Sequence, residues 1–181
     1  MYTVELNDFS KVPDYFSIFE HRKYGGHFLL ASEKTPHIFP ELADFEHMPN
    51  GPQIDYTVLE KDGFDTEHPL FICYVAEINK NLIGYAIAYY TYSTWCGKAM
   101  YLEDLYITPN YREKHIGSKL LKAIAKEAVN NNCCRLDFSV LEWNPACNFY
   151  KYKGATDMTI VEGWHHYRFS DTALKILAAD P

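Results

Sequence analysis

Apolar and aromatic residues gather in three runs between residues 70 and 107, and each run has the length and composition of a β-strand. The first two runs, 70–78 and 82–92, are separated by a short polar stretch, which predicts a hairpin with a tight turn. The third run covers 99–107. Because strands that follow one another closely usually pair, these three are expected to form an antiparallel sheet in sequence order.

The residues after these strands change to the period of a helix. Between 116 and 129 the apolar side chains fall on one stripe, which predicts an amphipathic helix. The residues expected largely off this stripe are Lys119, Lys122, Lys126 and Glu127. A short strand at 135–141 comes next, and the order strand, helix, strand makes it parallel to the strand at 99–107.

The C-terminal part predicts one more helix and one more strand. Asn144 is a capping residue in front of a helix that starts with Pro145 and ends at Gly154. The stretch WHHYRF, residues 164–169, has the aromatic composition of a last strand.

Strands and helices in this order predict an α+β fold, a mixed central β-sheet flanked by α-helices. The chain of 181 residues suits a single domain, 1–181, with a sizeable core. The first ~65 residues carry several prolines and few periodic runs, a pattern typical of short pieces and loops.

Composition excludes several classes of function. A formal net charge of −7 argues against a nucleic-acid partner. No apolar run approaches the ~20 residues that span a bilayer, and the N-terminus lacks a basic region followed by an apolar one. The five cysteines are odd in number and show no CxxC spacing, so reduced thiols in the cytoplasm are expected. The histidines are scattered, and no metal site is expected.

Several motifs in order along the chain resemble those of GNAT-superfamily N-acetyltransferases, within them the spermidine/spermine and thialysine acetyltransferase branch. The motifs are YSTW, YLEDLYITPNYR, IGSKLL, VLEWN, NFYKYKGA and EGWHHY. The resemblance covers roughly residues 64 to 170 with a weaker echo in 41–48, while residues 1–30 form an atypical N-terminal segment. It implies a GNAT-type sheet, acetyl-CoA as cosubstrate without a metal, and a homodimer.

The resemblance also assigns roles at the reacting centre. Glu103 matches the base that acts through water, and Tyr150 matches the acid beside the sulfur of CoA. The residues expected to surround the amine are Glu46, Trp95, Glu103 and Asp104. On a regular strand Glu103 and Asp104 point to opposite sides, so only one faces a given cleft unless a bulge intervenes.

Acetyl-CoA is expected to bind mainly through backbone groups. Leu105 and Ile107 match positions that pair with the pantetheine arm as an added strand would. A strand-to-helix turn matches the pyrophosphate site, where a helix N-terminus supplies N–H groups and a positive dipole. The residues of this turn are Arg112, Glu113, Lys114, His115, Ile116, Gly117 and Ser118. Asn144 and Tyr150 match further contacts with the same arm.

The turn departs from the family pattern at two places. His115 stands where the middle glycine is expected, and Glu113 replaces a common glycine. A Cβ at such a position crowds a phosphate oxygen or strains a left-handed backbone by ~1–2 kcal/mol, although histidine tolerates that region better than most residues. Glu113 also places negative charge near an anion.

The resemblance predicts acetyl transfer from acetyl-CoA to the primary amine of a small cation. Ser93 makes the YSTW motif look more like thialysine-type members, which take a lysine-like amine, than polyamine-acetylating ones. Two alternatives remain open: a catalytically weak or inactive GNAT-like dimer that binds a partner, and a protein or peptide N-acetyltransferase.

Overall fold

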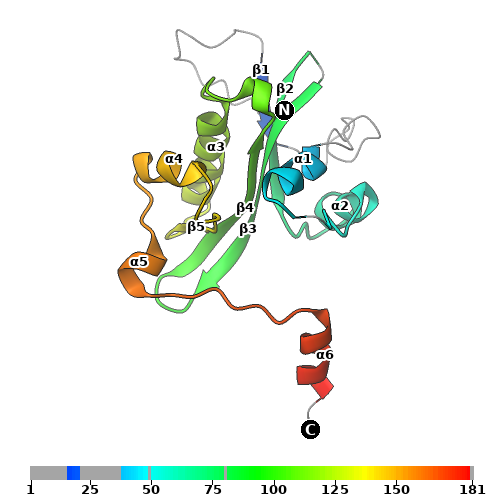
Figure 1. The fold of residues 1–181 in the computed structure, drawn as a ribbon, viewed down its shortest axis with the longest axis vertical. Coiled ribbons are helices and arrows are strands. Elements are labelled where there is room, and N and C mark those ends of the chain that lie inside the picture. Colours follow the sequence, from blue (N-terminus) through cyan, green and yellow to red (C-terminus); the bar gives the residue numbers. More distant parts are fainter. Residues whose placement is uncertain (1–15, 21–37, 49, 80, 180–181) are drawn as a thin grey trace. The chain divides into compact units, whose positions relative to one another are not determined.

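The computed structural model describes residues 16–20, 38–48, 50–79 and 81–179. The chain divides into two compact units, Met1–Ser139 and Val140–Pro181. The first unit holds the sheet and three of the α-helices, and the second holds three short helices (Figure 1).

The first unit is built on a five-stranded sheet in the order β1-β2-β3-β4-β5. The strands are β1 (Phe16–Glu20), β2 (Ile72–Ile78), β3 (Asn81–Ser93), β4 (Gly97–Ile107) and β5 (Leu136–Phe138). Neighbours are antiparallel except β4 and β5, which are parallel. The predicted antiparallel order of three strands and the parallel fourth are therefore confirmed. β1 lies in the N-terminal region, where the sequence predicted only short pieces.

Helix α3 (Ile116–Asn130) covers one face of the sheet and confirms the predicted amphipathic helix (Figure 1). Its side chains Ile116, Leu120 and Ile124 are buried in a core cluster with the sheet. Glu127 was expected largely off the apolar stripe, and this is wrong, because its side chain is only 8% exposed.

The burial of Glu127 has a physical reason in the hydrogen bonds that replace water around its carboxylate. The hydroxyl of Tyr90 donates at 3.1 Å, that of Tyr74 at 3.4 Å, and the side-chain amide of Asn131 at 2.9 Å. A polar residue on the apolar side of a helix is therefore tolerated here.

The opposite face of the sheet is covered by α1 (Ile38–Phe45) and α2 (Tyr56–Gly63) (Figure 1). A second core cluster lies on this side and includes Ile38, Tyr85 and Tyr106. The side chain of Asp55 caps α2, because it accepts hydrogen bonds from the backbone N–H groups of Thr57 at 2.9 Å and Val58 at 3.2 Å. The sequence did not predict these two short helices.

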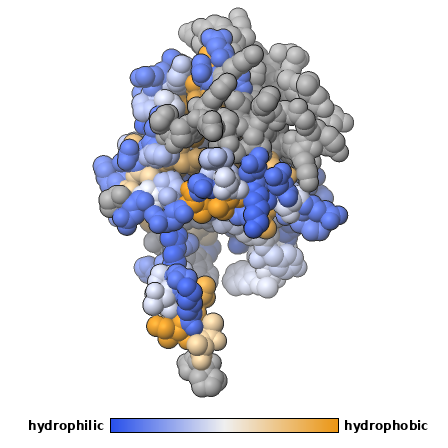
Figure 2. Space-filling model, turned by 90° about the vertical axis from the view of Figure 1, so that its right-hand side faces the viewer, coloured by the Kyte–Doolittle hydropathy of each residue, from blue (hydrophilic) through white to orange (hydrophobic). Residues whose placement is uncertain are grey.

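The second unit contains α4 (Ala146–Tyr152), α5 (Met158–Glu162) and α6 (Asp171–Ala179). Helix α4 begins at Ala146, one residue later than predicted, with Pro145 in the cap position. The side-chain oxygen of Asn144 accepts from the N–H of Ala146 at 2.9 Å, as the predicted cap would. Gly154 has a φ of 95°, which ends the helix as expected. Apolar side chains remain exposed on α6, at Leu174 and Ile176, as the orange patch on this helix shows (Figure 2).

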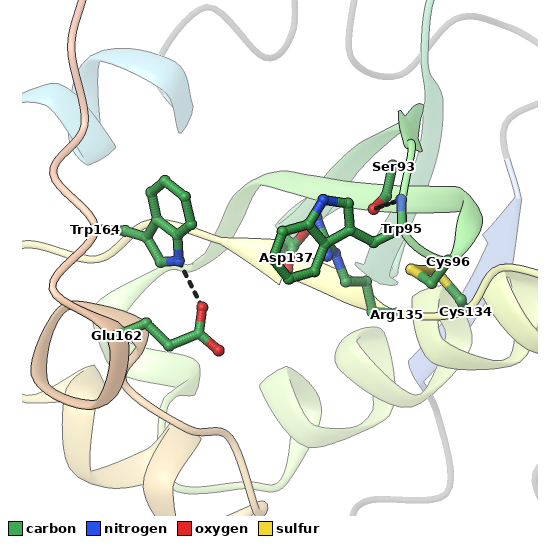
Figure 3. Close-up of polar contacts among 8 residues, drawn as sticks. All are labelled: Ser93, Trp95, Cys96, Cys134, Arg135, Asp137, Glu162 and Trp164. Atoms are coloured by element: carbon green, nitrogen blue, oxygen red, sulfur yellow. Dashed lines mark hydrogen bonds and ion pairs between the residues drawn. A yellow bond between two sulfur atoms is a disulfide. The ribbon is translucent and has the colours of Figure 1, made fainter.

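The prediction of a strand at 164–169 is wrong, since these residues form no strand in the structure. A strand needs a hydrogen-bonded neighbour, and in the described part of the chain no strand pairs with this stretch. Its aromatic side chains are largely exposed: Trp164 by 63%, Tyr167 by 87% and Phe169 by 62%. The indole N–H of Trp164 donates to Glu162 (Figure 3).

The expectation that all five cysteines are reduced is wrong for one pair, since Cys96 and Cys134 form a disulfide (Figure 3). Cys96 lies in the turn between β3 and β4, and Cys134 lies just before β5. They are 38 positions apart in sequence, so spacing gave no signal. The backbone brings them together, because the N–H of Cys134 donates to the carbonyl of Lys98 at 2.8 Å.

No helix in the described ranges is both long and apolar enough to cross a membrane.

Candidate active site

A β-bulge in β4 places the two carboxylates of the YLEDLYI motif. Along the pairing of β3 with β4, Ile87 faces Asp104 and the next residue, Ala88, faces Leu102, so Glu103 has no partner opposite it. An extra residue of this kind breaks the alternation of a strand, so that neighbouring side chains no longer point to opposite faces.

Hydrogen bonds from β3 show where the two carboxylates lie. The hydroxyl of Tyr85 donates to Asp104 at 3.4 Å, and the hydroxyl of Tyr89 donates to Glu103 at 3.2 Å. Because Tyr85 and Tyr89 are four residues apart on one strand, they share a face. Glu103 and Asp104 therefore both lie on the face that α1 covers. The sequence did not decide whether this strand contains a bulge, and the structure shows that it does.

Asp104 occupies an unusual electrostatic position for a carboxylate. Burial raises its pKa to about 6, and the charges of Glu103 and Glu46 act in the same direction, against the hydrogen bond from Tyr85. Glu46 follows the last residue of α1, and burial also raises its pKa. Glu46, Glu103 and Asp104 thus form an acidic cluster.

Tyr89 is the partner of the more exposed carboxylate. Partial burial raises its pKa to about 12, helped by the charge of Glu103 and by the hydrogen bond to it. The ring of Tyr89 stacks on that of Tyr101 with 5.4 Å between centroids. The hydroxyl therefore stays protonated and donates to Glu103.

Sequence reasoning missed Tyr85 and Tyr89. Their spacing of four within a predicted strand was a usable signal that they share a face. With 15 tyrosines in the chain, however, nothing marked these two as partners of the carboxylates before the pairing of β3 with β4 was known.

Trp95 is not brought to the carboxylate cluster in this unit. It lies at the tip of the β3–β4 hairpin, 91% exposed, where its backbone N–H donates to the hydroxyl of Ser93 (Figure 3). The strand β4 begins at Gly97, and Asp104 lies roughly 23 Å along it at ~3.3 Å per residue. The assignment of Trp95 to the amine site stays a prediction.

The second half of β4 leaves one edge open for a ligand backbone. Within the described residues, β5 pairs with β4 only from Met100 to Leu102, whereas β3 pairs with β4 along its whole length. Leu105 and Ile107 lie beyond the end of β5. Their position fits the predicted pairing with an extended arm, in the way that a peptide adds a strand to an exposed sheet edge.

The predicted pyrophosphate turn runs from a 3-10 turn at Pro109–Tyr111 to the start of α3. Glu113 and His115 both adopt the left-handed backbone, with φ of 61° and 60°. Both sites thus have the backbone conformation for which glycine is favoured, as their places in the motif predicted. Their side chains and that of Lys114 are exposed.

The first turn of α3 presents backbone donors, because the first four N–H groups of an α-helix have no intrahelical acceptor. His115 occupies the cap position without a capping hydrogen bond from its side chain. A Cβ on Gly117 would make only ordinary contact with Ile107, at 3.7 Å. Packing among the described residues therefore does not require glycine there.

Arg112 ties this turn to α1. Its Nε donates to the carbonyl of Ile107 at 2.9 Å, and its guanidinium lies over the ring of Phe45, 4.9 Å away, and near that of Tyr106, 5.5 Å away. Such cation–π contacts hold a guanidinium in place. Since Phe45 precedes Glu46, the C-terminal end of α1 contacts the predicted anion site through Arg112 and also carries a residue of the acidic cluster.

Asn144 and Tyr150 belong to the second unit, which is described by itself. The side chain of Asn144 is engaged in capping α4. Tyr150 is partly buried on α4, with its ring edge-on to Phe149 and 5.1 Å between centroids. Their predicted contacts with acetyl-CoA stay predictions.

Known proteins are similar to this chain over most of its length. Residues 36–155 match the Acetyltransferase (GNAT) family. A protein of Mus musculus named thialysine N-epsilon-acetyltransferase is 42% identical over 147 residues, which is 76% of this chain and 86% of the relative. The human spermidine/spermine N(1)-acetyltransferase-like protein 1 is 38% identical over 78% of this chain and 21% of its own length.

Solved structures are similar to this chain in fold. An integron cassette protein from the mobile metagenome of V. cholerae is similar with a TM-score of 0.71 and 27% identity, over 92% of this chain and 99% of that one. An aminoglycoside acetyltransferase from a soil metagenome is similar with a TM-score of 0.65 over 86% and 96%, and at 15% identity it shows the fold alone. With its mixed sheet, its motifs and these matches, the chain belongs to the acetyltransferase (GNAT) family.

Proposed function

We propose that this protein transfers the acetyl group of acetyl-CoA to the primary amine of a small cation, thialysine or a similar lysine-like amine, with polyamines as the second choice. The observation that carries the proposal is the acidic cluster of Glu46, Glu103 and Asp104, which suits an ammonium group. The name of the 42% identical relatives supports thialysine.

The chemistry needs a route for three proton transfers. The ammonium must lose one proton before its nitrogen can attack the thioester carbon, the nitrogen loses a second proton as the carbon–sulfur bond breaks, and the departing thiolate gains one. Glu103 takes the first proton through a water molecule, Tyr150 protonates the thiolate, and the second proton of the nitrogen leaves to water or restores the Tyr150 hydroxyl. Asp104 and Glu46 hold the positive charge of the amine.

Acetyl-CoA is the cosubstrate that family membership implies. The open edge of β4 at Leu105 and Ile107 and the first turn of α3 have the backbone donors and acceptors that its pantetheine and pyrophosphate groups need. Glu113 opposes this binding by charge, and the Cβ of His115 opposes it by bulk.

A catalytically weak or inactive binding protein is the second candidate, and the substituted turn favours it. Glu113 and His115 carry side chains where the backbone conformation suits glycine. This candidate predicts a folded dimer with little acetyl transfer.

The test of the proposed function is release of CoA thiol from acetyl-CoA in the presence of a panel of amines. Thialysine, lysine, ornithine, spermidine and a peptide with a free N-terminus cover the alternatives. We expect the highest kcat/KM with thialysine. Binding of acetyl-CoA without turnover on any amine would favour the second candidate, and preference for the peptide would contradict both.

Homodimerisation is proposed from the exposed stretch 164–169 and the apolar side chains of α6. An extended segment with large aromatic side chains and no strand neighbour among the described residues suits pairing with a second copy. Sedimentation at micromolar concentration is expected to give twice the mass of the 21.0 kDa chain. A monomer under these conditions would contradict this part of the proposal.

Glu103→Gln is expected to lower kcat by about 10²-fold and to flatten the rise of kcat with pH, because the proton acceptor is lost. The measurement is a pH–rate profile with saturating thialysine. Glu67→Gln is the matched control, since Glu67 is exposed in the connection between α2 and β2. A profile in Glu103→Gln like that of the control would remove the base from this position.

Tyr150→Phe is expected to lower kcat by about 10²-fold while the Kd for acetyl-CoA barely changes, because only the hydroxyl that protonates the thiolate is removed. Calorimetry gives the Kd, and thiol release gives kcat. Tyr152→Phe is the control on the same helix, since Tyr152 is 85% exposed. Equal losses of binding and rate in Tyr150→Phe would mark this residue as a packing residue.

The double change Glu113→Gly with His115→Gly is expected to tighten acetyl-CoA binding by about ten-fold, roughly 1–2 kcal/mol, by removing one negative charge and one Cβ. Relief of left-handed strain acts separately on the stability of the fold, partly offset by glycine entropy. Calorimetric titration measures the affinity.

Lys114→Gly is the control for this pair, because it adds a glycine and removes a positive charge, and it is expected not to tighten binding. Weaker acetyl-CoA binding in the double variant would show instead that the Glu113 and His115 side chains contribute to binding.

A further inference from the structure

Tyr85 is the most enclosed polar side chain beside the acidic cluster. It is 0% exposed, with its ring 4.7 Å from that of Phe39 on α1 and 6.2 Å from that of Tyr106 on β4. Packing on several sides fixes the direction of its hydroxyl, which donates to Asp104 at 3.4 Å. The hydroxyl is thus aimed at the carboxylate from within the core.

The other groups around Asp104 are two carboxylates, which oppose its negative charge, and one thiol, which burial keeps neutral. Glu103 lies beside it on β4, Glu46 faces it from the end of α1, and the buried thiol of Cys73 faces it from β2. The negative charges of Glu103 and Glu46 repel the negative charge of Asp104, and burial removes water from the Asp104 carboxylate. Tyr85 is the group on β3 that favours the ionised form, because a donor hydroxyl stabilises a carboxylate more than a carboxylic acid.

An ammonium group binds an ionised carboxylate far better than a neutral acid. Whatever keeps Asp104 ionised and correctly oriented therefore sets the affinity for the amine. We propose that Tyr85 is a positioning residue for the amine substrate, which acts by orienting the Asp104 carboxylate and keeping it ionised at neutral pH. This inference rests on the proposed function and identifies the group that controls the affinity of the site for the amine.

Two tyrosine–carboxylate pairs on one face of the sheet then have different proposed roles, one in proton transfer and one in binding the amine. Tyr89 donates to Glu103, the residue proposed to accept the proton, and Tyr85 donates to Asp104, the residue proposed to bind the charge. Tyr85 is buried behind Asp104 and acts through it. Loss of the Tyr85 hydroxyl should therefore alter amine binding and leave the chemical step almost unchanged.

The test is Tyr85→Phe, which keeps the ring and removes one oxygen. We expect the KM for thialysine at pH 7 to rise by about 3- to 10-fold, the size of one lost hydrogen bond of ordinary strength, with kcat changed by less than two-fold. Since the lost bond favoured ionisation, Asp104 should now keep its proton to higher pH. The fall of KM with rising pH should be displaced toward higher pH.

Tyr74→Phe is the matched control. Tyr74 is also buried, and its hydroxyl also donates to a carboxylate at 3.4 Å, but that carboxylate belongs to Glu127 on the other face of the sheet. Urea unfolding of both variants verifies that they are folded. The same displacement of KM in Tyr74→Phe, or a Tyr85→Phe variant that loses kcat with KM unchanged, would overturn the proposal.

A readout without turnover separates this inference from the proposed function. Carboxyl ¹³C NMR follows the titration of Asp104, assigned by its absence in Asp104→Asn, and addition of thialysine gives a Kd. We expect a higher midpoint and a 3- to 10-fold weaker Kd in Tyr85→Phe. An equal Kd in both proteins would overturn the inference. Absence of acetyl transfer to any amine, together with the weaker Kd, would overturn only the proposed function.

Discussion

The site depends on one break in the alternation of β4. On a regular strand Glu103 and Asp104 would face opposite sides of the sheet, one toward α3 and one toward α1. The bulge at Glu103 turns both toward α1 and lets two tyrosines of β3 serve them. The same strand continues past the end of β5, so the acidic cluster and the open edge lie next to each other along β4.

The sequence predicted the elements whose signal is local. The strands β2 to β5, α3 and α4 follow from apolar runs and caps that are read within a few residues. The bulge was left open because its cause is the pairing with β3, and α1 and α2 were missed because prolines and short length hide their period. Cys96 with Cys134, and Glu127 with Tyr74 and Tyr90, depend on partners far along the chain, which no local pattern shows.

Holding Asp104 in this cluster costs stability, and the sign can be worked out. Its pKa of about 6 in the folded protein lies above the ~3.9 of an unfolded chain, so folding favours the protonated acid. The stabilisation is complete below pH ~4 and is lost as the pH rises through about 6. At neutral pH the protein therefore gives up stability to keep a buried negative charge, as functional sites often do.

The disulfide between Cys96 and Cys134 turns the central part of this unit into a covalent ring. The ring contains all of β4 with its two carboxylates, the turn at Glu113 to His115, and α3. Closing a loop of 38 positions lowers the entropy of the unfolded chain, which stabilises the folded state by roughly 4 kcal/mol at 25 °C. The strand that carries Glu103 and Asp104 and the turn proposed to hold the pyrophosphate thus lie within one ring, closed by a bond that a reductant would open.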